Sequence, residues 1–127
     1  MPNILVVDDD PALRRILQMT LELEGYQITL AENGEEALRA LARTPLPDVV
    51  ILDVMMPKID GLQVLQQARQ HPRTADIPVI LLTARRDADD LWEGWRRGVD
   101  YYITKPFDVE DLLRVLDKVL PGRAPAL

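Results

Sequence analysis

The sequence has no cysteine and no long apolar run, and both absences narrow what the chain can be. Without cysteine it holds neither a disulfide framework nor a thiolate metal site, which fits a reducing cytosol. No apolar stretch approaches the ~20 residues of a membrane span, and the N-terminus lacks the basic start and apolar core of a signal peptide. We therefore expect a cytoplasmic protein without membrane contacts.

Positive charge is also scarce. The chain has 15 lysines and arginines against 21 aspartates and glutamates, which gives a formal net charge of −6. Because an acidic surface repels a phosphate backbone, we do not expect this chain itself to bind nucleic acid. The 127 residues suit one domain with its own core. We assign this domain to residues 1–121 and a C-terminal tail, or the start of a linker, to residues 122–127.

Five short apolar runs alternate with segments of helical periodicity. Apolar runs of this length between helical segments are typical of buried parallel strands. The expected strands are Ile4–Val7, Gln27–Ala31, Val49–Leu52, Val79–Leu82 and Tyr101–Thr104. The run at Gln27–Ala31 is the least apolar, so we expect it near an edge of the sheet.

An amphipathic segment follows each run. The first begins at Pro11 behind the N-cap residue Asp10 and ends at Gly25. Its apolar face consists of Leu13, Ile16, Leu17 and Leu21. The other expected helices are Gly34–Ala42, Leu62–Ala68, a segment around Leu91, Trp92 and Trp95, and Val109–Leu120. The alternation predicts an α/β fold, (βα)5, with helices on both faces of a doubly wound parallel sheet.

Charged or hydroxyl-bearing residues come directly after four of the runs. They are Asp8 and Asp9, Asp53, Thr83 and Lys105. In such a sheet ligands bind outside the carboxyl ends of the strands, so these side chains are expected to converge. Three carboxylates, a hydroxyl and an ammonium group suit a hard cation and a phosphoryl group.

Taken alone, each of these residues has a plainer interpretation. A threonine at a strand end is usually a satisfied turn residue, and a lone lysine is usually solvated. Adjacent buried carboxylates, however, repel unless a cation neutralises them, so the combination favours a site. We interpret Asp10 as a helix cap only, and the arginine pairs at 14–15, 85–86 and 96–97 as solvated surface.

The motifs, taken in their order and spacing over residues 3–120, resemble the receiver domain of bacterial two-component response regulators. The matching segments are Ile4–Asp10, Leu52–Pro57, Asp60–Gly61, Leu82–Ala84 and Gly98–Phe107. The resemblance implies a flavodoxin-like receiver fold with strand order 2-1-3-4-5, in which the first and third strands are neighbours.

The resemblance also implies roles for the acidic residues. Asp53 would be the phosphoacceptor, phosphorylated by a sensor histidine kinase or a histidine phosphotransfer protein. Mg²⁺ would be the cofactor in this phosphorelay. Asp9 and Asp53 would bind it directly, Asp8 through a water molecule, and Met55 through its backbone carbonyl.

Three further residues receive roles from the resemblance. Lys105 and Thr83 would contact the transferred phosphoryl group. Thr83 and Tyr102 would then change the surface formed by the fourth helix, the fifth strand and the fifth helix. The bond between Lys105 and Pro106 is expected to be cis. On this interpretation the chain is no enzyme for an external substrate and catalyses only its own phosphotransfer and autodephosphorylation.

A homodimer through that same surface is a further implication. Leu91, Tyr101 and Val115 occupy the positions where DNA-binding relatives of this family carry charged pairs, so we expect apolar packing instead. Trp95 is expected in the core and Trp92 partly exposed.

Other functions remain open at this point. A pseudo-receiver could dock partners without phosphorylation. A small aspartate-nucleophile phosphatase of the haloacid dehalogenase type also carries an aspartate pair such as Asp8 and Asp10, but Ala12 departs from its motif and the chain has no room for a cap. A nucleotide or flavin module is disfavoured because neither GxxxxGK[ST] nor GxGxxG occurs.

Overall fold

The computed structural model describes residues 2–84 and 98–120. Its five parallel strands are β1 (Asn3–Val7), β2 (Gln27–Ala31), β3 (Val49–Asp53), β4 (Val79–Ala84) and β5 (Tyr101–Lys105). They form one sheet in the order β2-β1-β3-β4-β5, which confirms the expected order and places β2 at an edge. No helix within these ranges is long and apolar enough to cross a bilayer.

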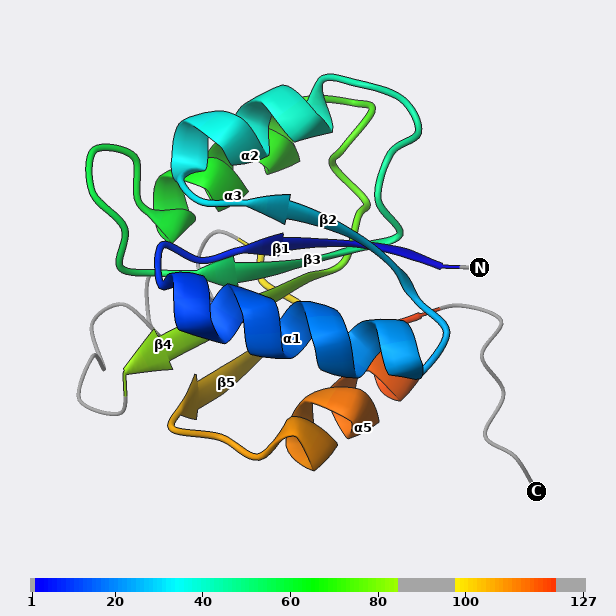
Figure 1. Cartoon of the computed structure of the whole chain (residues 1–127). Coiled ribbons are helices and arrows are strands. Elements are labelled where there is room, and N and C mark those ends of the chain that lie inside the picture. Colours follow the sequence, from blue (N-terminus) through cyan, green and yellow to red (C-terminus); the bar gives the residue numbers. More distant parts are fainter. Residues whose placement is uncertain (1, 85–97, 121–127) are drawn as a thin grey trace.

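Within the described residues, four helices cover the sheet. They are α1 (Pro11–Leu23), α2 (Gly34–Leu41), α3 (Gly61–Gln70) and α5 (Val109–Val119). Figure 1 shows α2 and α3 on one face and α1 and α5 on the other, and each face has its own apolar core. The helix expected around Leu91, Trp92 and Trp95 lies outside the described residues, as do the predicted tail and the arginine pairs at 85–86 and 96–97.

Because β1 lies next to β3, the residues that follow these two strands come close together. Val7, the last residue of β1, is in register with Leu52 in β3. The residues that follow, Asp8 and Asp53, are therefore brought to the same point at the carboxyl edge of the sheet. This is the edge at which doubly wound sheets bind their ligands.

Local sequence signals define the helix ends close to this edge. The side chain of Asp10 accepts a hydrogen bond from the backbone N–H of Ala12, so the cap predicted for α1 is confirmed. Gly61 opens α3 directly against β3, and a Cβ atom at this position would lie 2.2 Å from the carbonyl oxygen of Asp53. Only glycine fits there, which keeps α3 close to the site.

The start of β5 is anchored by a residue of α3. Arg69 donates from Nε to the carbonyl of Gly98 at 3.0 Å and pairs through Nη2 with Oδ2 of Asp100 at 2.8 Å. The same oxygen of Asp100 accepts a hydrogen bond from the backbone N–H of Val79 in β4. These bonds fix the residues that lead into the strand carrying Lys105.

Two expectations about buried faces were wrong. Ile16, placed on the apolar face of α1 that was expected to pack on the sheet, is 52% exposed, because helical periodicity locates an apolar stripe but not how much of it the sheet covers. Val115, assigned to a protein-binding surface, is buried in the core under α5 together with Leu112 and Leu116. It lies three residues after Leu112, which places both on the same side of the helix.

Candidate functional site

The carboxyl edge of the sheet collects the polar residues expected there. Asp8, Asp53 and Thr83 are buried, with exposed fractions of 0%, 4% and 1%, whereas Asp9 is exposed. Burial of a carboxylate costs free energy unless charges or hydrogen bonds compensate for it. Fold stability alone therefore does not explain why carboxylates are buried at this edge.

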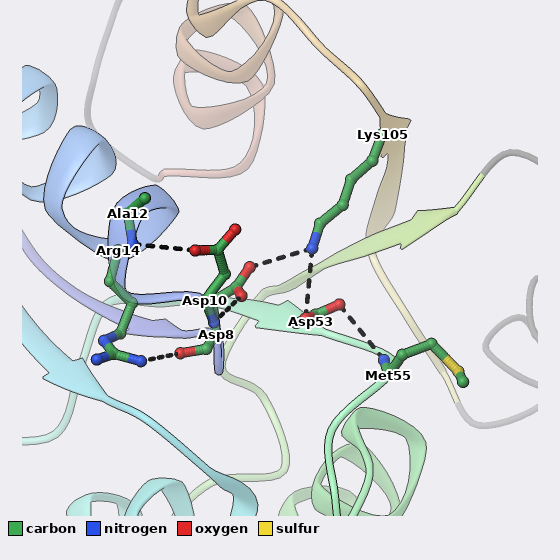
Figure 2. A network of polar contacts seen from close by, with 7 residues as sticks. All are labelled: Asp8, Asp10, Ala12, Arg14, Asp53, Met55 and Lys105. Atoms are coloured by element: carbon green, nitrogen blue, oxygen red, sulfur yellow. Dashed lines mark hydrogen bonds and ion pairs between the residues drawn. The ribbon is translucent and has the colours of Figure 1, made fainter.

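Lys105 supplies the positive charge between the two buried carboxylates. Its Nζ lies 3.2 Å from Oδ2 of Asp8 and 3.3 Å from Oδ2 of Asp53. Figure 2 shows the side chain extending from the end of β5 toward both groups. The peptide bond from Lys105 to Pro106 is cis, as expected.

The charges of Asp53 and Lys105 depend on each other. Burial, and after it the negative charge of Asp8, raises the pKa of Asp53 from 3.8 to about 7, although Lys105 and the backbone N–H of Met55 oppose this rise. Burial alone lowers the pKa of Lys105. The charges of Asp53 and Asp8 outweigh that effect and raise its pKa above 10.5.

Three carboxylates are close enough together to bind one cation. One oxygen from each of Asp8, Asp9 and Asp53 lies within 4.8 Å of the others. Two oxygens bound to the same Mg²⁺ lie at most about 4.2 Å apart, because each Mg–O distance is about 2.1 Å. The three residues fit Mg²⁺ after a small adjustment, or with water between the ion and one of them. An all-oxygen set is also the one that Mg²⁺ prefers.

Met55 contacts Asp53 through its backbone. Its N–H donates to Oδ1 of Asp53 at 3.3 Å; the residue is 61% exposed, and its side chain points away from the acidic cluster (Figure 2). The bond orients the carboxylate of Asp53. The metal-binding role expected for the carbonyl of Met55 stays a prediction.

Thr83 and Tyr102 lie on neighbouring strands. Tyr102 is in register with Leu81, and Thr83 follows Leu81 by two residues, so Thr83 and Tyr102 are on the same face of the sheet. Tyr102 is partly buried against the core under α2 and α3. This placement is the one that the expected switch requires, but their roles remain predictions.

One residue of the site was missed in the sequence. Arg14, interpreted as solvated, donates from Nη1 to the backbone carbonyl of Asp8 at 2.7 Å, and its side chain is only 16% exposed (Figure 2). Its neighbour Arg15 is exposed, as expected for both. Only one feature of the sequence distinguishes Arg14 from Arg15. Arg14 directly follows Leu13 and lies three residues before Leu17, which places it next to the apolar face of the helix.

The parallel sheet in this order, with acidic residues and a lysine at its carboxyl edge, places the chain among doubly wound α/β domains with an acidic site. The sequence matches the family described as the response regulator receiver domain over residues 4–117. The chain belongs to this family.

Individual relatives agree with this assignment. The chain is 47% identical over 113 residues to the DNA-binding dual master transcriptional regulator RpaA of Synechocystis sp., covering 89% of this chain and 46% of RpaA. It is 42% identical over 123 residues to the protein PilH of Pseudomonas aeruginosa, covering 96% of this chain and 100% of PilH. The chain thus spans about half the length of RpaA, of the response regulator MprA of Mycolicibacterium vanbaalenii and of the probable transcriptional regulator ycf27 of Guillardia theta, but all of PilH.

One similar solved structure contains a metal ion. The receiver domain of the sensor histidine kinase PA1611 from Pseudomonas aeruginosa PAO1 is 28% identical, with a TM-score of 0.87, covering 95% of this chain and 98% of that one. That structure has a magnesium ion coordinated in its active-site cleft. The acidic cluster of the present chain has the composition for the same ion.

Proposed function

We propose that this chain is a phosphoacceptor domain of a two-component system, phosphorylated on Asp53. The observation that carries the proposal is the contact of Lys105 with both Asp53 and Asp8, beside a third carboxylate at the ligand-binding edge. This set of charges is costly for a core and suited to a doubly charged cation and a phosphoryl group. Family membership supports the same conclusion.

The proposed reaction is a transfer of a phosphoryl group from a phosphohistidine. An oxygen of the Asp53 carboxylate forms a bond to phosphorus while the P–N bond to the donor imidazole breaks, and the electron pair of that bond stays on the nitrogen. The ionised form of Asp53 is the nucleophile. The hydrogen bond from the Met55 N–H to Oδ1 holds this carboxylate in one orientation.

Lys105 and Thr83 act on the group after transfer. Lys105 now contacts both carboxylates, and its ammonium group can move to a phosphoryl oxygen without leaving the site. Thr83, buried at the end of the neighbouring strand, donates its hydroxyl to a second oxygen. Movement of Thr83 frees space into which Tyr102 rotates, which changes the surface next to β5.

Mg²⁺ is the proposed cofactor, held directly by Asp9 and Asp53, by Asp8 through water and by the carbonyl of Met55. When bound, it neutralises the negative charge that otherwise keeps a carboxylate and a phosphoryl group apart. The three carboxylates within 4.8 Å of one another support this assignment.

The proposed donor is a sensor histidine kinase or a histidine phosphotransfer protein. It must reach the exposed side of the site, where Asp9 lies and where α1 begins. Along the exposed side of α1 lie Ile16, Met19 and Leu23, with exposed fractions of 52%, 57% and 88%. We propose that the donor packs on this apolar strip, and that the encounter takes place in the cytoplasm.

Phosphorylation by a small-molecule donor tests the proposal. In the presence of Mg²⁺ and acetyl phosphate, mass spectrometry should show one added phosphoryl group on the wild-type chain and none on Asp53→Asn. The matched control is Asp10→Asn, which removes the same charge at an exposed position and keeps a residue able to cap α1. It should be phosphorylated like wild type. An adduct on Asp53→Asn would place the acceptor elsewhere.

A further inference from the structure

We propose that Arg14 is a positioning residue for the metal site. By holding the backbone carbonyl of Asp8, it fixes the turn that allows Asp8 and Asp9 to face the same cation. The inference rests on the proposed Mg²⁺ site and adds to it a residue that binds neither metal nor phosphoryl group.

The need for such a residue follows from strand geometry. Consecutive residues of a strand point to opposite faces of the sheet, so Asp8 and Asp9 could not share a ligand if β1 continued through them. The strand instead ends at Val7, and oxygens of both carboxylates lie in one cluster with Asp53. The backbone at Asp8 must therefore hold a conformation that the sheet does not impose.

Three hydrogen bonds hold this turn. The N–H of Asp8 still donates to the carbonyl of Ala31 in β2 at 3.2 Å. The N–H of Asp10 donates to Oδ1 of Asp8 at 2.9 Å. The carbonyl of Asp8 belongs to the peptide bond between the two acidic residues. It accepts a hydrogen bond from Nη1 of Arg14 at 2.7 Å, the shortest of the three. A donor with a full positive charge makes this bond stronger than a neutral one.

Arg14 is itself fixed in place. Its side chain is 16% exposed, and its Nη2 lies 3.7 Å from Oε2 of Glu32, which follows β2. The guanidinium therefore joins the end of β2, the turn after β1 and the helix α1 on which Arg14 lies. Neighbouring Arg15 is on the same helix but exposed, which makes it a matched control.

Positioning and simple electrostatics predict opposite effects. If Arg14 acted only through its charge, it would repel Mg²⁺, and Arg14→Gln would bind Mg²⁺ more tightly. If it positions the turn, the same substitution weakens binding, because groups that orient metal ligands are worth about 10-fold or more in metal affinity. The sign of the change decides between the two.

The experiment is a calorimetric titration of Mg²⁺ into the full chain and its variants. We expect Arg14→Gln to bind Mg²⁺ about 10-fold more weakly, Arg14→Lys to recover part of the loss, and Arg15→Gln to stay within about twofold of wild type. Arg14→Met, which keeps much of the aliphatic stem and removes charge and donors, gives the same reading if Arg14→Gln fails to fold. Thermal melting without Mg²⁺ confirms that each variant is folded at the temperature of titration.

Each outcome has one meaning. Unchanged or tighter Mg²⁺ binding by a folded Arg14→Gln or Arg14→Met overturns the positioning role and leaves the proposed function standing. Equal losses in the Arg14 and Arg15 variants also overturn it, because they would show an effect of charge on α1 in general. Failure of the wild-type chain to bind Mg²⁺ at all would remove the proposed metal site and, with it, this inference.

Discussion

The carboxyl group of Asp53 is subject to opposing influences that set its charge. Burial and the neighbouring charge of Asp8 raise its pKa to about 7, and Lys105 counteracts them. The folded chain therefore keeps a proton on Asp53 at pH values between 3.8 and about 7, where the unfolded chain has released it. The contribution of this group to the free energy of unfolding is fully present at low pH and is lost as the pH rises through about 7.

We therefore predict a pH-dependent effect of Mg²⁺ on stability. Without metal, the melting temperature of wild type should fall relative to that of Asp53→Asn as the pH rises from about 5 to about 8. The increase in melting temperature caused by Mg²⁺ should grow over the same interval, because a metal binds the ionised carboxylate. Circular dichroism melts with and without Mg²⁺ measure both effects.

Asp53→Asn is the control, because its amide does not ionise in this range. In this variant the increase in melting temperature caused by Mg²⁺ should be small, and it should not grow with pH because no carboxyl group titrates at position 53. An identical Mg²⁺ response in wild type and Asp53→Asn at every pH would contradict both the raised pKa and the role of Asp53 as a ligand.

At the scale of the element, α1 has two different sides. One side contributes Leu17 and Leu21 to the core, and the other leaves Ile16, Met19 and Leu23 in solvent. These three follow one another at intervals of three and four residues, so they form a strip along one side of the helix. The helix starts at the acidic turn, so the strip extends along α1 from the site and offers the surface on which we propose that the donor packs.

We predict that Met19→Glu separates two routes of phosphorylation. A charge in the middle of the strip should slow transfer from a phosphorylated histidine kinase about 10-fold or more, the effect expected for a central interface residue. Phosphorylation by acetyl phosphate should be unchanged, because this donor needs no protein surface. The kinase used is one that phosphorylates the wild-type chain, and transfer is followed with radiolabelled phosphate.

Gln66→Glu serves as the comparison, since Gln66 is exposed on α3, on the opposite face of the sheet. It should affect neither route. Equal transfer from the kinase to wild type and Met19→Glu would show that the donor docks elsewhere.

The elements also show what the sequence could and could not predict. The strands themselves and the convergence of the acidic residues at one edge followed from the apolar runs and the direction of parallel strands. The cap followed from Asp10 standing before Pro11, and the strand order that makes Asp8 and Asp53 neighbours followed from the resemblance to receiver domains. The exposure of Ile16 did not follow, because periodicity identifies a stripe without its boundaries. The contact of Arg14 with Asp8 did not follow either, because it depends on the angle between α1 and the turn before it.

At the scale of the whole molecule, the described part of the surface expected to be apolar, on β5 and α5, is mostly charged, whereas Leu91 and Trp92 lie outside the described residues. Val115 belongs to the core, and the exposed residues of α5 are all charged: Glu110, Arg114, Asp117 and Lys118. Tyr101 is partly buried, and the ammonium group of Lys118 lies 5.7 Å from the centre of its ring. The described part of this surface therefore offers charged groups to a partner.

We predict that self-association through this surface is weakened by salt. Sedimentation in Mg²⁺ and beryllofluoride, a phosphoryl mimic, should give a dimer at low ionic strength that dissociates near 1 M salt, where the screening length falls to about 3 Å. Arg114→Glu should weaken the dimer at low salt. Association that is equally strong at both salt concentrations would show that apolar packing holds the dimer, and a monomer under all conditions would exclude the dimer.

The order of the strands along the chain has a consequence for synthesis on the ribosome. Asp8 and Asp53 both emerge in the first half of the chain, but Lys105, the cation that pairs with them, emerges about fifty residues after Asp53. A nascent chain that pairs β1 with β3 early brings two carboxylates together with no countercharge, which opposes their burial. The last strand thus completes the fold electrostatically as well as sterically. Chains whose translation stops before Lys105 are therefore expected to be substrates for proteases rather than partly active receivers.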